Sequence, residues 1–170
     1  MNFLEQLAAE YFTLQGYFVR TNMKFGKRLK GGWVGEMDVA AFAPMSRELV
    51  HIETSMDADR WEERVSRLIR KFDDASKYYK ELFDFPIHSI SRIAVAGFSV
   101  QQEQPRIRRD IELKTCPQFI SEIGAELLQR HPLKRAVPET LPLLRAMQFA
   151  VHWGPQSQIF RKEYKALTKS

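Results

Sequence analysis

Two neighbouring runs of alternating residues, at 35–42 and 48–55, constrain the fold of this chain more than any other feature. Apolar and polar side chains alternate with a period of two in each run, and a short turn at 44–47 separates the runs, which is typical of adjacent antiparallel strands. Asp38 lies inside the first run and Glu53 inside the second. Because Asp and Glu are poor strand residues, these carboxylates either face water on an exposed side of the sheet or have a chemical role.

The rest of the chain shows alternating helical and strand patterns. Apolar residues at steps of three and four predict helices, and short apolar runs predict strands. The predicted helices are 2–15, 57–83, 117–130 and 139–152, and the further strands are 17–22, 89–100 and 110–115. This order predicts an α/β fold with a mixed sheet and helices on its faces, and 170 residues of globular composition predict one domain spanning 1–170.

Composition limits the classes of function. No apolar run approaches the length of a membrane span, and the N-terminus lacks the pattern of a signal peptide. Cys116 is the single cysteine, so an internal disulfide and a cysteine zinc site are excluded. We therefore expect a cytoplasmic protein without a membrane partner, and a net charge of +5 favours a polyanion such as nucleic acid.

A basic stretch from Arg20 to Lys30 contains five cations and no acid. Its glycines give the backbone freedom, so it resembles a loop that contacts phosphates. An ordinary solvated connection would have the same composition, and both interpretations stay open. The candidate nucleic-acid-binding residues are Lys24, Lys27, Arg28 and Lys30.

Three carboxylates are expected to converge in this fold. If the first helix lies across the sheet, one of its glutamates approaches Asp38 and Glu53. Carboxylate oxygens without cysteine, and with few histidines, are the ligands that Mg²⁺ or Mn²⁺ prefers.

These residues and their spacing resemble the PD-(D/E)xK nuclease superfamily, which includes restriction endonucleases and Holliday-junction resolvases. Glu5 lies eleven positions before Gly16, as a helical glutamate precedes a glycine-aromatic turn in the family. The segment 35–39, Gly-Glu-Met-Asp-Val, matches the family's GE-hydrophobic-D-hydrophobic strand, and 49–55 matches its strand ending in ExK. The resemblance covers about 3–115 and implies a restriction endonuclease-like mixed sheet flanked by helices, with 117–153 as a C-terminal helical addition.

The resemblance implies a metal-dependent endonuclease that hydrolyses phosphodiester bonds of nucleic acid, with DNA as the expected substrate. Asp38, Glu53 and Glu5 are then the residues that hold Mg²⁺ or Mn²⁺, and Glu5 orients the attacking water. Glu36 shares the face of Asp38 and is either a supporting residue or a surface acid. His51 lies two residues before Glu53 and either contacts water or phosphate, or is a polar residue that the strand accommodates.

The sequence departs from the family at the ExK lysine, which falls at Ser55. Ser55 supplies no cation, so a positive charge has to come from elsewhere. The candidates are Arg60 or Arg64 in the following helix, Lys71 farther along it, and the less favoured Lys24. An arginine would stabilise phosphate charge but serve poorly as a base, because it stays protonated.

A second interpretation follows from Ser55: a catalytically inactive nuclease fold that binds nucleic acid or a protein partner. The region 131–142 with the final helix is the candidate surface for a homodimer.

Overall fold

The computed structural model describes residues 2–97 and 107–154. These residues divide between two compact units, 1–119 and 120–170. The first unit contains the sheet and the helices packed on it, and the second contains most of α4 and all of α5. Among the described residues no helix is both long and apolar enough to cross a membrane.

The sheet is mixed, which confirms the predicted α/β fold. Its five strands follow one another in the order β1-β2-β3-β4-β5. Pairing is antiparallel from β1 to β3 and parallel from β3 to β5. The strands are β1 (Phe18–Lys27), β2 (Trp33–Ala43), β3 (Glu48–Ser55), β4 (Ser89–Ala96) and β5 (Glu112–Thr115).

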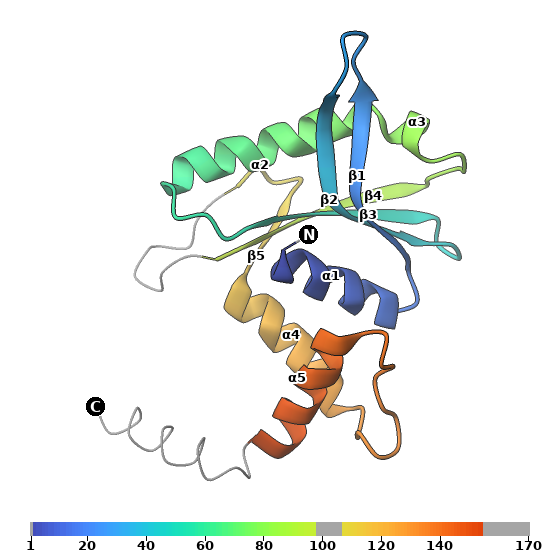
Figure 1. The fold of residues 1–170 in the computed structure, drawn as a ribbon, viewed down its shortest axis with the longest axis vertical. Helices are drawn as coiled ribbons and strands as arrows, with labels where there is room; N and C mark the ends of the chain where they lie inside the picture. The colour runs from blue at the N-terminus through green and yellow to red at the C-terminus, as the bar shows by residue number, and fades with distance from the viewer. Residues whose placement is uncertain (1, 98–106, 155–170) are drawn as a thin grey trace. The chain divides into compact units, whose positions relative to one another are not determined.

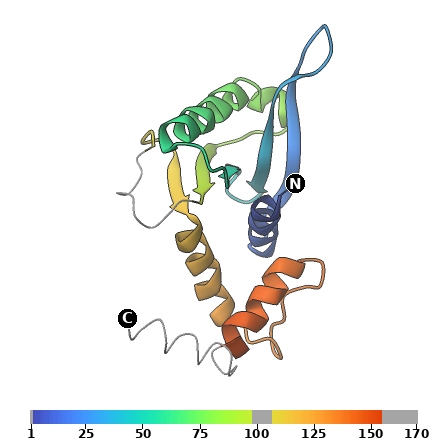
Figure 2. The same cartoon turned by 60° about the vertical axis from the view of Figure 1, so that its left-hand side comes forward.

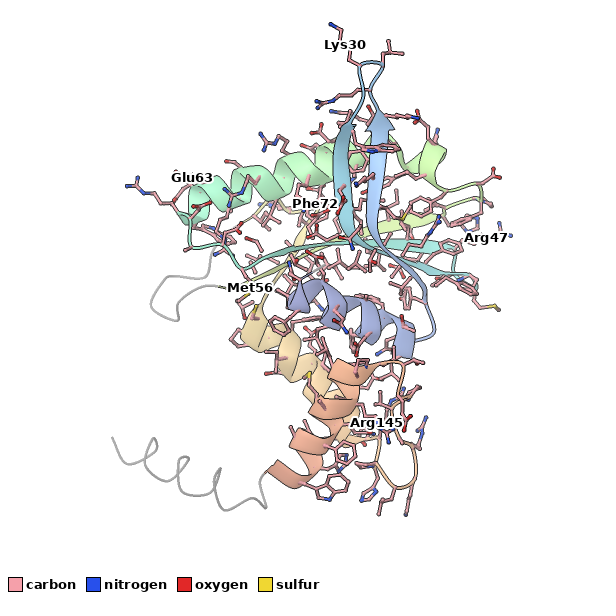
Figure 3. The ribbon with its side chains drawn as sticks, viewed as in Figure 1. Lys30, Arg47, Met56, Glu63, Phe72 and Arg145 are labelled. Atoms are coloured by element: carbon pink, nitrogen blue, oxygen red, sulfur yellow. The ribbon has the colours of Figure 1, made fainter. Side chains whose placement is uncertain are left out.

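Helices cover both faces of this sheet (Figure 1). On one face lies α1 (Phe3–Leu14), which begins at an Asn2 cap and buries Leu4 and Leu7. On the other face lies α2 (Trp61–Ser76), whose Phe72 is labelled in Figure 3. Phe72 belongs to a buried apolar cluster with Ala94 of β4. The sequence therefore gives each helix one apolar stripe and each stripe is buried against the sheet.

The predicted helix 57–83 is wrong in its extent, because the structure divides it. After α2 the chain turns and a short α3 (Tyr79–Leu82) follows. Tyr78 packs against Phe25 with ring centroids 5.4 Å apart, while Tyr79 is buried and bonds to His51. Consecutive side chains of a regular helix point about 100° apart. The turn between α2 and α3 allows the Tyr78 ring to reach Phe25 while the Tyr79 ring reaches His51.

The predicted loop over the basic stretch is also largely wrong. The predicted strand 17–22 is confirmed by β1, which does not end there: residues 23–27 also belong to β1 and pair with β2 as far as Lys27 and Trp33. Only 28–32 form the connection, which is closed by a hydrogen bond of 3.0 Å from the Arg28 N–H to the Gly32 carbonyl. Gly31 and Gly32 have φ angles of 90° and 80°, which glycine adopts at no steric cost. The result is a hairpin that extends past the other strands (Figures 1 and 2).

The second unit is described by α4 (Cys116–Leu128), α5 (Pro142–Trp153) and their connection. Gln148 of α5 is fully buried, accepts a hydrogen bond from the Val137 N–H and donates to the carbonyls of Arg130 and Arg135. One amide thus fixes the connection between the helices. The C-terminal helices agree with the prediction, whereas residues 98–100 of the predicted strand 89–100 lie outside the described residues.

Candidate functional site

Two carboxylates from adjacent strands lie side by side at the centre of the sheet. Asp38 and Glu53 lie one position beyond the Val39–Ile52 pair in the β2–β3 register, and the Asp38 N–H donates to Glu53 Oε1 at 3.4 Å. Thr54 holds Asp38 Oδ2 through its N–H at 2.8 Å and its hydroxyl at 3.2 Å. Asp38 is 9% exposed and Glu53 0%, so these acids do not lie on a wet face of the sheet.

Lys71 of α2 supplies a cation to both carboxylates. Its Nζ donates to Asp38 Oδ1 at 2.7 Å and forms an ion pair with Glu53 Oε2. Burial alone would lower the pKa of Lys71, but the charges of Glu53 and Asp38 and their hydrogen bonds outweigh it and raise the pKa. Lys71 is therefore protonated at neutral pH, and its charge offsets part of the repulsion between the two acids.

A buried histidine and tyrosine hold the other oxygen of Glu53. His51 Nε2 lies 2.7 Å from Glu53 Oε1, and His51 Nδ1 lies 2.7 Å from the Tyr79 hydroxyl. Because a carboxylate accepts, we assign the ring proton to Nε2, and the Tyr79 hydroxyl then donates to Nδ1. Burial is the main cause that raises the pKa of Tyr79. His51 therefore lies between Glu53 and Tyr79, where it holds the Glu53 carboxylate in place.

Ser55 and Arg64 form a separate cluster at the ends of β3 and β4. The Arg64 guanidinium donates to Ser55 Oγ at 3.0 Å, to the Ser55 carbonyl at 2.7 Å and to the Gly97 carbonyl at 2.6 Å. Burial, the leading cause, lowers the pKa of Arg64. Arg64 is thus committed to backbone carbonyls rather than to Asp38 or Glu53. Arg60 is exposed at the N-cap of α2, and the residue that contacts the two acids is Lys71.

Glu5 borders the site but is engaged elsewhere. Its carboxylate accepts from the Asn2 N–H at 3.0 Å and from the Asn2 side-chain amide at 2.6 Å, which completes the cap of α1. Within residues 2–97 and 107–154, no group of three His, Cys, Asp or Glu side chains has metal-binding spacing. In this arrangement Glu5 caps α1 and lines the same cavity as Asp38 and Lys71, and its role as a metal ligand stays a prediction.

Two surface cavities meet at the pair formed by Asp38 and Lys71. One, of about 290 Å³, is lined by both of these residues together with Glu5, Ser55 and Arg64, and also by Thr54, Asp57, Arg67 and Leu68. The other, of about 320 Å³, continues to the base of the β1–β2 hairpin and is lined by Phe25, Val34, Gly35, Glu36, Asp38, Arg70, Lys71 and Asp74. The pair is therefore accessible from two sides, and cations of α2 flank it on both.

The predicted nucleic-acid-binding residues all lie on the β1–β2 hairpin. Lys24 is opposite Glu36, Lys27 is opposite Trp33, and Arg28 and Lys30 are in the connecting loop. All four cations are exposed, and Figure 3 shows Lys30 at the far end of the hairpin. No ion pair of the described residues involves any of them, so their charge is directed to solvent.

Comparison of the chain with models of known protein families, with curated proteins and with solved structures gave no match. The α/β architecture is established by the strand order and by the helices on the sheet.

Proposed function

We propose that this protein is a Mg²⁺-dependent endonuclease that hydrolyses phosphodiester bonds of DNA. The observation that carries the proposal is the contact of Lys71 with both Asp38 and Glu53. Two acids from adjacent strands and one lysine are the residue types of the PD-(D/E)xK site that the sequence resembles. Lys71 would take the role of the family's strand lysine, at whose position this chain has Ser55.

The two acids fit a divalent cation. Asp38 Oδ1 and Glu53 Oε2 both face one ammonium group, so a single cation is able to contact both oxygens. Glu53 Oε2 is buried, and its polar contact among the described residues is the Lys71 ammonium. Asp38 and Glu53 would hold Mg²⁺, which favours carboxylate oxygens and keeps several waters. When bound, the ion lowers the pKa of water and stabilises charge on the phosphoryl oxygens.

Lys71 would change partner when substrate binds. Once its two carboxylates have a divalent counter-ion, its N–H groups are available for a non-bridging oxygen of the scissile phosphate. Water would attack phosphorus and lose a proton to solvent as the new P–O bond forms, and the P–O bond to the leaving sugar oxygen would break as that oxygen takes up a proton from solvent. Because its pKa is raised, Lys71 acts in this step as a cation that offsets phosphate charge and not as a base.

The supporting residues hold this geometry. His51 and Tyr79 fix Glu53 Oε1, and Thr54 fixes Asp38 Oδ2. One oxygen of each acid is thus held by the protein, while the other points toward Lys71. Such an arrangement limits the reorganisation that binding of a cation requires.

The test is a calorimetric titration of Mg²⁺ and Mn²⁺ beside a cleavage assay on linear duplex, single-stranded and branched DNA. The native protein is expected to bind metal and to cut at least one substrate. Asp38→Asn and Glu53→Gln should lose both properties, and Lys71→Met should lose cleavage alone. If the native protein cuts none of these substrates at millimolar Mn²⁺, the nuclease proposal is wrong.

A catalytically inactive nucleic-acid-binding module is the second candidate, and one observation favours it. Lys71 already compensates the charge of Asp38 and Glu53, so the fold needs no metal to bring these acids together. This candidate predicts that the native protein and Asp38→Asn bind DNA equally well and that neither cleaves it.

A further inference from the structure

The far end of the β1–β2 hairpin carries an apolar side chain between two cations. Arg28, Leu29 and Lys30 follow one another in the connection, and all three are exposed. Leu29 is fully exposed, so folding gains nothing from its apolar surface. A single exposed leucine is ordinary on a protein surface, and its position within the hairpin is what gives this one significance.

The charge of the hairpin favours a polyanion. The segment 11–35 contains five cations and no acid. Four of these cations, Lys24, Lys27, Arg28 and Lys30, lie on the hairpin beyond Val39, the last residue of β2 that pairs with β3. None of the four is in an ion pair of the described residues. Lys and Arg that contact phosphates release condensed counterions from DNA, which is the main source of sequence-independent affinity.

The hairpin is continuous with the candidate site. The cavity of about 320 Å³ is lined by Phe25 and Gly35 of the hairpin and by Asp38 and Lys71. Asp38 and Trp33 are five residues apart on β2, which corresponds to about 17 Å along a strand. At about 3.4 Å per base pair, a duplex that runs along β2 with its scissile phosphate at Asp38 would reach the level of Trp33 after about five base pairs, and the connection 28–32 lies beyond it.

We propose that the hairpin binds the minor groove of duplex DNA and inserts Leu29 between two base pairs, with Arg28 and Lys30 on the flanking phosphates. Apolar side chains that enter the minor groove partly unstack a base step and kink the duplex. This inference rests on the proposed function, because it takes nucleic acid as the substrate, and it narrows the substrate to duplex DNA.

The same chemistry argues against other nucleic acids. Single strands have no base-pair step for Leu29 to separate, and they are bound by aromatic stacking platforms in basic grooves. A-form RNA has a wide and shallow minor groove that displays hydroxyl groups, which an isolated leucine does not recognise. The four cations would attract all of these polymers, so Leu29 is the residue that distinguishes them.

The experiment measures binding without divalent metal, so that it does not depend on cleavage. A 30-base-pair duplex with a dye at each end reports affinity and bending, and a single strand of the same sequence is the comparison. Leu29→Ser is matched by Met45→Ser, because Met45 is an equally exposed apolar residue in the β2–β3 turn. Arg28→Gln with Lys30→Gln is matched by Lys134→Gln with Arg135→Gln, two exposed cations of the second unit.

The native protein is expected to bend the duplex by at least about 20°. Leu29→Ser should lose the bend and bind the duplex about tenfold more weakly, with single-strand affinity and thermal midpoint unchanged, whereas Met45→Ser should behave as the native protein. The Arg28 and Lys30 double variant should lower the slope of log affinity against log salt by about 1.8.

Two results would overturn the inference: an unbent duplex in the native complex, or equal effects of Leu29→Ser and Met45→Ser. The nuclease proposal fails by a different result, namely the absence of metal binding and of cleavage. The DNA-bending and affinity measurements contain no divalent metal, so their results do not depend on that failure.

Discussion

Lys71→Met is the change that most directly tests the electrostatics of the site. Methionine keeps most of the aliphatic stem but removes the ammonium, and it leaves Asp38 and the fully buried Glu53 adjacent without a cation. Removing one partner of a buried ion pair typically costs about 3–5 kcal/mol. Because the Lys71 side chain is 36% exposed, we reduce this to about 2–3 kcal/mol for solvent screening.

A loss of this size is measurable by thermal or urea unfolding. For a chain of this length 1 kcal/mol corresponds to roughly 2–4 °C, so the midpoint of Lys71→Met should fall by roughly 5–10 °C. Mg²⁺ should restore the stability, since a ligand at 100 times its Kd adds about 2.7 kcal/mol. The variant should also bind Mg²⁺ about tenfold more tightly than the native protein, a difference of about 1.4 kcal/mol, because no ammonium competes for the carboxylates.

Lys77→Met is the matched control, since Lys77 follows α2 and pairs with Asp74 on the surface. Because surface ion pairs contribute little, its loss should leave the unfolding midpoint close to that of the native protein, with no effect of Mg²⁺. The reasoning is refuted if Lys71→Met is as stable as Lys77→Met, or if it binds Mg²⁺ no better than the native protein does.

Three further predictions concern the same region. The pKa of Lys71 is raised by folding, so the stability that Lys71 contributes is complete below its ordinary pKa of 10.5 and is lost as pH rises through the raised value. Unfolding midpoints measured between pH 8 and 12 should therefore show the native protein more stable than Lys71→Met, with this difference in midpoint closing only at alkaline pH. Arg64→Met removes the guanidinium donors to the Ser55 and Gly97 carbonyls, although the Ser55 carbonyl keeps the Gly97 N–H as a donor, and it should cost about 1–3 kcal/mol by urea unfolding. Arg67→Met, which loses surface pairs with Asp57 and Asp59, should leave the urea midpoint close to that of the native protein. His51→Phe leaves Glu53 Oε1 without its histidine donor and should weaken Mg²⁺ binding by about 10–100-fold in calorimetry, while Tyr79→Phe, which keeps the His51–Glu53 bond, should weaken it less.

Local pattern was sufficient for much of the fold. The alternation through Asp38 and Glu53 predicted two adjacent strands, and the stripe through Leu68 and Phe72 predicted the helix that covers them. These patterns arise because one side of each strand or helix is buried, so apolar residues recur every second position in a strand and every third or fourth position in a helix. The basic segment after Arg20 has no regular apolar repeat, because Phe25 is its one large buried side chain while Lys24 and Lys27 are exposed. Its continuation as a strand depends on pairing with β2.

The site was predictable only in part. Strand alternation is enough to predict that Asp38 and Glu53 share a face of the sheet. Which cation contacts them depends on where α2 packs on that face, because this position decides which of its side chains reaches the two acids. Lys71 stood among several candidates, since it flanks the apolar stripe of its helix and no local pattern sets its distance from Asp38. The bond between His51 and Tyr79 joins residues 28 positions apart, and such a contact follows from tertiary packing alone.

The contacts of Ser55 have a consequence for how this chain tolerates change. Ser55 Oγ lies 3.0 Å from Arg64 Nε, and Arg64 in turn joins the ends of β3 and β4. A lysine at position 55 would place a second positive charge next to the Arg64 guanidinium. It would also line the cavity that contains Lys71, which already pairs with Asp38 and Glu53. Positions 55, 64 and 71 are therefore interdependent, and a substitution at any one of them is tolerated only according to which residues occupy the other two.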